Sequence, residues 1–349
     1  MAKSAQELEA LAQQVFGGEF PLDAKSQIKE LDKRGPLAEE LATLAFKDKD
    51  KAAWKLVQDG IFGLPIFKVT SGIQTSDRRR AFFRGDLLSF GIRDTIWEVE
   101  EKNLPRITSP ERASGERAGE IVEAEFRKRS VQAHPYFKYI AEGDFSPEQE
   151  RAAALSYLHS VMVRIRTVHR AIMLVQIPME FHDCIKISKL VVDELGEGEL
   201  HKAHAQRTAQ DIEKWGGTVD WHAPVDSTEM KAMLNWNLRT VTHPDQLWSF
   251  TGIFCVEWNS YLELRAGLLA LRKRGISDDM MEVLVQHGDG DPYDRDQHAL
   301  LVRQELGSRI QTPEDCDQVL TGVAYHQGLY HGFFEGEFAK LRANVEGTK

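Results

Sequence analysis

The stretch SPEQERAAALSYLHSVMVRIRTVHRAIMLV, residues 146–175, decides the fold class. Its apolar residues recur at spacings of three and four, the pattern of a helix that buries one face. It opens with Ser146-Pro147-Glu148, where the serine can cap free amides, the proline suits the first turn and the glutamate opposes the helix dipole. We therefore predict a long helix over 147–175.

The rest of the chain has the same texture, because alternation of apolar and polar residues is rare and helical spacing is common. We predict an all-α protein. Further helices are expected over 4–16, 22–32, 36–46, 49–61, 110–131, 178–214, 227–240, 245–273, 278–287, 292–308 and 313–341. Since these segments become longer and more regular near residue 110, we divide the chain into an N-terminal helical extension, 1–109, and a helical bundle, 110–349.

Composition excludes several classes of function. The chain of 349 residues has a formal net charge of -10, which argues against a nucleic-acid partner, since such proteins neutralise phosphates with clustered cations. Its three cysteines form no CxxC pair and are too few for a disulfide framework. No stretch approaches the roughly 20 apolar residues needed to cross a bilayer. We expect a cytoplasmic protein without a membrane partner.

The histidines are distributed unevenly. None of the 12 lies before His134, so the predicted bundle holds every imidazole of the protein. Imidazoles and carboxylates on facing helices are how bundles build transition-metal sites. Stretches of the predicted bundle that combine the two are therefore the candidates for a metal site.

The first block is DELGEGELHKAH, residues 193–204. On an unbroken helix Glu194 and His201 would lie about two turns apart on one face. The two glycines between them weaken the helix, and if they interrupt it His204 is an equal candidate. The other two glutamates of the block are interpreted as solvated. The prediction is thus Glu194 with either His201 or His204.

The second block is a single acidic residue, Glu257, in the apolar run FCVEWNSY at 254–261. A carboxylate is rarely buried unless it is paired or binds a metal, so a structural salt bridge and metal ligation both explain it. Glu263 is expected to meet solvent or a basic neighbour.

The third block, HGDGDPYDRDQH at 287–298, is the densest. His287, Asp291, Asp294 and His298 would form one stripe on continuous helix, although its glycines and proline favour a break with Asp291 as a cap. Two histidines and acidic residues in such a short stretch favour a metal site. A calcium loop is a weaker alternative, because the EF-hand spacing and its terminal glutamate are missing.

Four residues are candidates for contact with a substrate, namely His159, Arg166, His169 and Tyr261. The first three share the helix predicted over 147–175, where a pocket lining and a solvated or core role are both open. The later histidines, at 326 and 331, lie in an aromatic stripe that is more typical of a core.

Together the blocks resemble the haem-oxygenase-like diiron oxidases and oxygenases. The segments His134-Pro135-Tyr136-Phe137 and Phe145-Ser146-Pro147-Glu148-Gln149, a long helix with Tyr157 and the block at 193–204 follow in the order of that family. The resemblance covers roughly residues 115–345.

The family pattern has a glutamate followed by glycines and a histidine, further carboxylates, and a late His-x-x-x-Asp-x-x-His cluster. The resemblance implies metal ligation by Glu194 with His201 or His204, by Glu257, and by residues of the third block. Two departures stand out. Asp294 occupies the place of the last histidine, and the nearest imidazole is His298. No glutamate occurs between Glu150 and Glu180, where relatives often have one.

The activity implied by the resemblance is dioxygen activation by two iron ions per chain, Fe(II) or Fe(III), with O2 as co-substrate. We expect N-oxygenation or hydroxylation of a small nitrogen-containing metabolite, an external electron donor, and a homodimer to which the extension contributes a dimerisation surface or a lid. Alternatives are desaturation or carbon-carbon cleavage of an amino acid or fatty acid, a haem-binding or cofactor-free member of the same fold, and a non-catalytic iron-binding or helical interaction protein.

Overall fold

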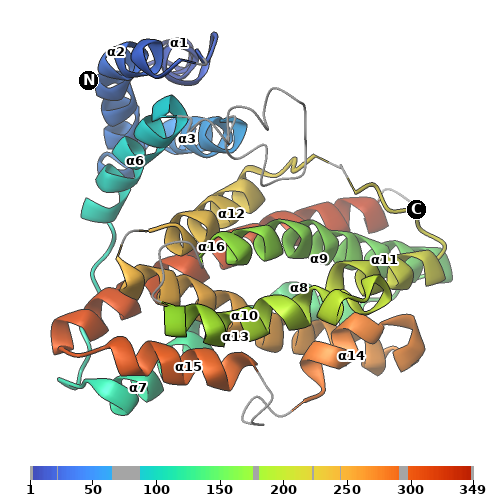
Figure 1. The fold of residues 1–349 in the computed structure, drawn as a ribbon. Helices are drawn as coiled ribbons and strands as arrows, with labels where there is room; N and C mark the ends of the chain where they lie inside the picture. The colour runs from blue at the N-terminus through green and yellow to red at the C-terminus, as the bar shows by residue number, and fades with distance from the viewer. Residues whose placement is uncertain are drawn as a thin grey trace. The chain divides into compact units, whose positions relative to one another are not determined.

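The computed structural model describes residues 3–21, 23–64, 87–175, 181–221, 224–243, 245–290 and 298–346, and the side chains of 166 and 168–175 are left out of that description. Every regular element in these ranges is a helix (Figure 1), which confirms the predicted all-α fold. Among the described residues, no helix is both long and apolar enough to span a lipid bilayer.

The chain divides into two compact units, the first made of Met1–Pro105 with Pro224–Asn235 and the second of Arg106–Ala223 with Trp236–Lys349. The first unit contains α1 (Ala5–Phe16), α2 (Ala24–Ala42), a π-helical turn η1 (Thr43–Lys47), α3 (Lys51–Gly63) and α6 (Leu87–Lys102). The long helix α12 (Thr228–Val241) belongs to both units, since its first half lies in the first and its second half in the second.

Helix α2 corrects the expectation that Gly35-Pro36 separates two helices, because it runs through both residues. A proline inside a helix removes one hydrogen bond and costs about 3 kcal/mol. Beyond the proline the helix buries Ala38 and Leu41 completely, and a fully buried leucine contributes roughly 1.5–3 kcal/mol. Tertiary packing therefore offsets the local break.

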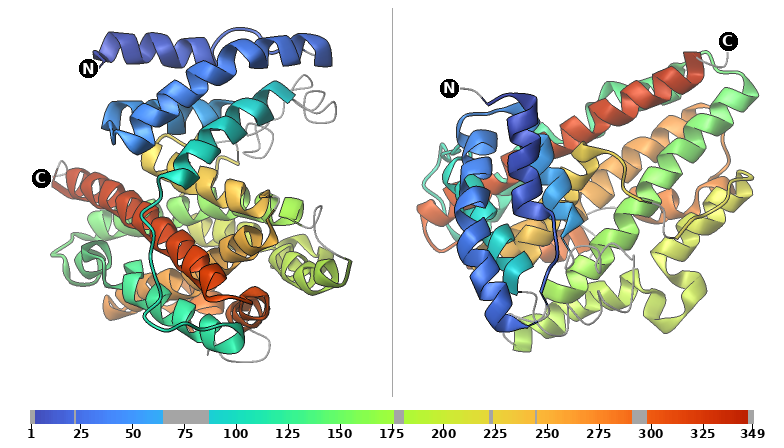
Figure 2. Two further views of the ribbon diagram at one scale, coloured as in Figure 1. Left: turned by 90° about the vertical axis from the view of Figure 1, so that its left-hand side faces the viewer. Right: turned by 90° about the horizontal axis from the view of Figure 1, so that it is seen from above.

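The second unit holds the remaining helices. They are α7 (Gly115–Arg129), η2 (Val131–Ala133), α8 (Pro135–Glu142), α9 (Pro147–Val175), α10 (Phe181–Glu194), η3 (Gly196–Gly198), η4 (Leu200–Lys202), α11 (His204–Lys214), α13 (Gln246–Lys273), η5 (Asp278–Met280), α14 (Glu282–Gly288), α15 (His298–Arg309) and α16 (Pro313–Glu346). The long helices α9, α13 and α16 run through this unit (Figures 1 and 2).

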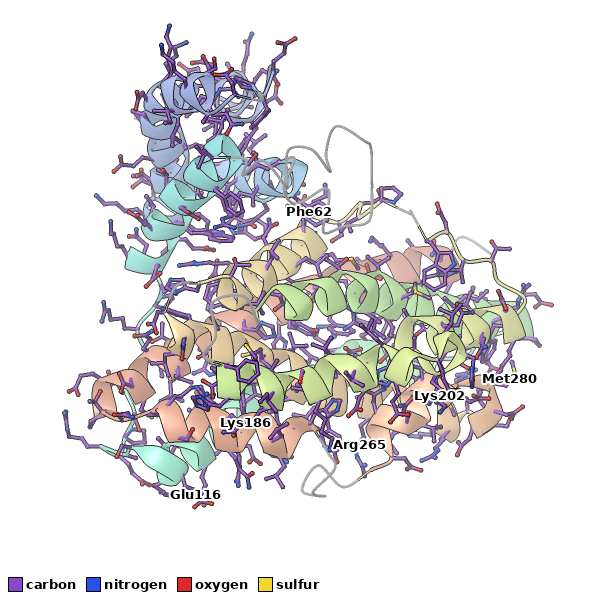
Figure 3. The ribbon with its side chains drawn as sticks, viewed as in Figure 1. Phe62, Glu116, Lys186, Lys202, Arg265 and Met280 are labelled. Carbon is purple, nitrogen blue, oxygen red and sulfur yellow. The ribbon has the colours of Figure 1, made fainter. Side chains whose placement is uncertain are left out.

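Helix α13 is the centre of the second unit. It buries residues on every side, as expected of a helix that is apolar all round, and it packs against α8, α9, α14, α15 and α16. Side chains from these helices fill the space between them (Figure 3). Polar residues carried by α13 are consequently held inside the unit.

A Ser-Pro-Glu or Thr-Pro-Glu motif, at 109–111, 146–148 and 312–314, predicts the start of three helices, and the prediction is right at the last two and wrong at the first. Ser146 caps α9 through the amide of Gln149, and Thr312 caps α16 through the amide of Asp315. Ser109 does not begin a helix, and α7 starts only at Gly115. The segment is instead held to α16, since the amide of Ser109 donates to the Asp317 side chain at 2.7 Å and the amide of Ile107 donates to the Thr321 hydroxyl at 3.0 Å.

Candidate metal centre

The first block forms a tight reversal of the chain rather than a continuous helix. Helix α10 ends at Glu194, two short 3-10 turns follow, and α11 begins at His204. Gly196 has φ +73°, and a Cβ at this position would lie 2.4 Å from the backbone nitrogen of Ala203. Only glycine fits such a left-handed and crowded position. The reversal brings His204 Nδ1 to 2.5 Å from Glu194 Oε2.

This geometry distinguishes His204 from His201, the two histidines that the sequence leaves as equal candidates. Glu194 and His204 are both buried, with 6% and 4% of each residue exposed. His201 points away, with 69% of its side chain exposed, and lies 3.5 Å from the exposed Glu199. The pairing of Glu194 with His201 needs an unbroken helix, which the reversal removes.

Glu257 enters the site from the central helix α13. Its residue is 6% exposed, and its Oε2 lies 3.4 Å from His298 Nδ1. The same nitrogen of His298, the first residue of α15, lies 3.7 Å from Glu194 Oε1. The other ring nitrogen, Nε2, lies 3.0 Å from Asp193 Oδ2. Three carboxylates therefore surround one imidazole.

His287 completes the site from the short helix α14. Its Nδ1 lies 2.8 Å from the carbonyl oxygen of Val283, to which it can donate, and its ring centre lies 4.5 Å from that of His204. Helix α14 packs closely on α13, since a Cβ on Gly288 would lie 2.8 Å from the Cα of Arg265. The Arg265 guanidinium also donates to the Gly288 carbonyl at 2.7 Å. These contacts fix the position of the His287 ring.

The ligand atoms form two groups that share one carboxylate. Glu194, His204 and His287 make the first group, and Glu194, Glu257 and His298 make the second. Within each group the candidate ligand atoms lie within 4.8 Å of one another. Imidazole and carboxylate donors of this kind suit iron, so the residues present fit the metal that the resemblance implies.

The pKa values of His287 and His298 are shifted in opposite directions. Burial, followed by the neighbouring His204, lowers the pKa of His287 to about 4, so this imidazole is neutral at neutral pH, the form that binds metals. Burial would also lower the pKa of His298, but hydrogen bonds to Glu257 and Asp193 raise it to about 9. The carboxylates around His298 thus favour a positive charge at this point.

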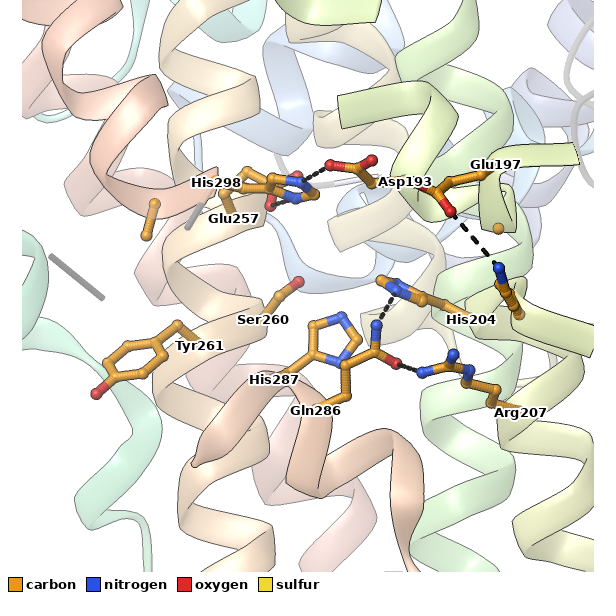
Figure 4. Close-up of a pocket in the computed structure, with 13 residues that line it drawn as sticks. Asp193, Glu197, His204, Arg207, Glu257, Ser260, Tyr261, Gln286, His287 and His298 are labelled. Carbon is orange, nitrogen blue, oxygen red and sulfur yellow. Dashed lines mark hydrogen bonds and ion pairs between the residues drawn. The ribbon is translucent and has the colours of Figure 1, made fainter. Parts of the chain in front are cut away.

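A cavity of about 300 Å³ opens onto the ligands (Figure 4). It is lined by Asp193, Gly196, Glu197, Lys202, His204, Arg207, Glu257, Ser260, Tyr261, Gln286, His287, His298 and Ala299. The guanidinium of Arg207 donates to Gln286 Oε1 at 2.5 Å, and the Gln286 amide nitrogen lies 2.9 Å from His204 Nε2. Figure 4 shows this chain of contacts from α11 to α14.

Two of the four candidate substrate-binding residues, Tyr261 and His159, can be placed relative to the cavity. Tyr261 lines the cavity, whereas the half-buried His159 is not among its lining residues. The side chains of Arg166 and His169 lie outside the described residues, as do Asp291 and Asp294 of the third block.

Sequence reasoning missed several lining residues, above all Asp193, Arg207 and Gln286. Each directly precedes a ligand or lies one helical turn from one, and this adjacency is the only signal that the sequence offers. Because charged and amide side chains are common on solvated helix faces, adjacency alone does not distinguish a site residue from a surface residue.

A second, smaller cavity of about 40 Å³ lies against Glu194, Glu257 and His287. Among its lining residues are Arg164 and Glu263, which form a buried ion pair, so the basic neighbour predicted for Glu263 is Arg164. The hydroxyl of Tyr157 donates to Glu263 Oε1 at 2.7 Å. This pair is fully satisfied within the protein, which suits a structural role behind the ligands.

The two later histidines differ in burial. His326 is fully buried, and the amide nitrogen of Asn259 donates to its Nε2 at 2.7 Å. Burial lowers the pKa of His326 to about 3, which keeps the ring neutral. His331 is half-buried and lies 2.9 Å from the Arg129 carbonyl oxygen through Nε2. Neither ring is part of the two ligand groups.

Comparison with known protein families gives a match to part of the chain. A family model described as an iron-containing redox enzyme matches residues 169–330. No curated protein matches the chain. The matched range contains all five residues of the two ligand groups, together with Asp193, Arg207 and Gln286.

Proposed function

We propose that the chain is a member of the haem-oxygenase-like family of iron-containing redox enzymes, and that it activates O2 at a pair of iron ions to oxidise a small polar metabolite. Oxidoreductase activity and iron binding follow from the family and from the candidate ligand groups. The number of iron ions, the use of O2 and the substrate class are our proposal.

The observation that carries the proposal is the position of Glu194 in both ligand groups. A single metal ion needs only one such group, and a carboxylate common to two groups suits two neighbouring ions. We assign one ion to Glu194, His204 and His287 and the other to Glu194, Glu257 and His298. Bound iron would supply the redox centre at which dioxygen is reduced.

The protein's own contribution is to hold the imidazoles in fixed directions. The Val283 carbonyl engages Nδ1 of His287, which leaves Nε2 of that ring for a metal. His204 has its Nε2 against Gln286 and its Nδ1 toward Glu194. These contacts come from α10, α11 and α14, so the protein itself orients the two rings.

The cavity supports a small polar substrate. Its volume of about 300 Å³ is at the lower end for small-molecule sites. The carboxylate of Glu197 suits an amino nitrogen, and the guanidinium of Arg207 suits an anionic group. We therefore favour a nitrogen-containing metabolite that also carries an anion, oxidised by N-oxygenation or hydroxylation, over a long aliphatic chain.

The test is anaerobic loading with Fe(II) followed by mixing with O2, in the presence of amines, amino acids or fatty acids. We expect two iron ions per chain, a magnetically coupled pair in Mössbauer spectra, and O2 consumption that depends on one polar substrate. Iron uptake without substrate-dependent O2 consumption would instead indicate an iron-binding protein without catalysis. Binding of one ion or none would contradict the diiron site.

A further inference from the structure

Asp193 lines the cavity but is not a member of either ligand group. We infer that Asp193 is a positioning residue that holds the His298 imidazole with Nδ1 turned toward the metal. The inference rests on the proposed diiron function and adds a residue that neither the family match nor the ligand spacing identifies.

The two nitrogens of His298 face different partners (Figure 4). Nδ1 lies 3.4 Å from Glu257 and 3.7 Å from Glu194, which are the other members of its group. Nε2 lies 3.0 Å from Asp193 Oδ2. Because the two ring nitrogens point in different directions, a metal bound at Nδ1 leaves the Nε2 proton to be donated to Asp193.

The position of Asp193 on its helix explains how it reaches that nitrogen. Asp193 and Glu194 are the last two residues of α10, and successive helical side chains diverge by about 100°. They therefore approach the His298 ring from two sides, Glu194 at Nδ1 and Asp193 at Nε2. Among the described residues no lysine or arginine forms a salt bridge with Asp193, so its charge is directed at the imidazole.

A comparison of the three candidate imidazoles supports the assignment. His287 and His298 each turn one nitrogen toward an acceptor, the Val283 carbonyl and the Asp193 carboxylate, whereas Nε2 of His204 faces the amide nitrogen of Gln286, which can only donate. Of these three partners only Asp193 is charged. A carboxylate that accepts the outer N–H both orients the ring and increases the basicity of the nitrogen that binds the metal.

The experiment compares Asp193→Ala and Asp193→Asn with the matched control Glu197→Gln. Glu197 is also an acidic residue of the cavity wall, but it faces Lys202 at 3.7 Å. Anaerobic titration with Co(II) measures the affinity and number of ions, Co(II) absorption reports the ligand environment, and circular dichroism reports folding.

We expect the wild type and Glu197→Gln to bind two ions alike. Asp193→Ala should retain one ion at its original affinity and bind the second about 10- to 100-fold more weakly, the usual effect of losing such a partner. Asp193→Asn should lose less, since its amide oxygen still accepts from Nε2, and its Co(II) spectrum should differ from that of the wild type.

The outcomes separate the two proposals. Asp193→Ala with two ions at wild-type affinity overturns the positioning role and leaves the diiron proposal standing. A wild type that binds fewer than two ions overturns the proposed function, whatever the variants do. If Asp193→Ala fails to fold, Asp193→Asn decides the question, because an unchanged affinity and spectrum in that near-isosteric variant also overturns the role.

Discussion

Replacement of Glu194 by glutamine should remove both iron ions, whereas replacement of Glu257 should remove one. Glu194 is common to the two ligand groups, and Glu257 belongs to the second alone. Both residues are 6% exposed, so the two glutamine variants are matched in burial and in the loss of one negative charge. Any difference between them therefore reports the sharing of Glu194.

The size of the effect follows from the number of ligands lost. Each group has three candidate protein ligands, and Glu194→Gln takes the same one from both. Loss of a residue that only hydrogen-bonds to a metal ligand costs about 10- to 100-fold in metal affinity. Loss of the ligand itself should therefore cost at least about 100-fold per ion, or roughly 2.7 kcal/mol. Glu257→Gln should impose that loss on one ion only.

The assay is anaerobic Fe(II) titration followed by desalting and measurement of retained iron, with circular dichroism to verify folding. We expect two ions in the wild type, one in Glu257→Gln and fewer than one in Glu194→Gln. If Glu194→Gln retains one tightly held ion, or if the two variants lose iron equally, the argument from a shared carboxylate is wrong.

Three further predictions concern the cavity, the core and the reversal. Arg207→Met should raise KM for an anionic substrate about 10- to 100-fold, the worth of a charged hydrogen bond, without changing iron content, and an unchanged KM in steady-state kinetics would count against the anion contact. Arg164→Met leaves Glu263 buried without its cation and should lower the free energy of unfolding by about 3–5 kcal/mol in urea titrations. The additional change Glu263→Leu should recover part of it, and a single variant as stable as the wild type would refute the argument. Gly196→Ala should weaken iron binding and lower the temperature of thermal unfolding more than Gly198→Ala does. Both glycines have positive φ, but only at position 196 would the new Cβ lie 2.4 Å from a backbone atom, the nitrogen of Ala203. Equal effects of the two substitutions would exclude the crowding argument.

The fold class could be predicted because helices depend largely on local pattern. The caps at Ser146 and Thr312 are satisfied within their own helices, and both helices begin where the sequence places them. Ser109 has the same local signal, but its amide is engaged by Asp317, more than two hundred residues later in the chain. The same motif thus precedes a helix at two positions and a non-helical segment held to α16 at the third, and the motif itself does not contain that difference.

The sequence predicts the three blocks that form the metal centre, but not which histidine of the first block lies beside Glu194. The spacing of Glu194 and His201 fits one face of a helix, which made His201 a candidate equal to His204. The reversal at Gly196 depends on a left-handed backbone and on close contact with Ala203, and glycine in a sequence indicates only that such a conformation is allowed. Choosing the histidine therefore required the path of the backbone.

The residues that orient the ligands were beyond prediction for a different reason. A ligand needs a chemical type that is rare inside a protein, so a buried glutamate such as Glu257 stands out in its apolar run. A partner such as Asp193 needs only one acceptor oxygen at the right place, and its half-exposed position at a helix end is one where acidic residues are ordinary. Its role arises from a contact with His298, 105 positions away, and that contact exists only once α10 and α15 are packed together. The ligands of such a site can be sought in sequence, whereas the groups that aim them have to be sought in the contacts of the folded chain.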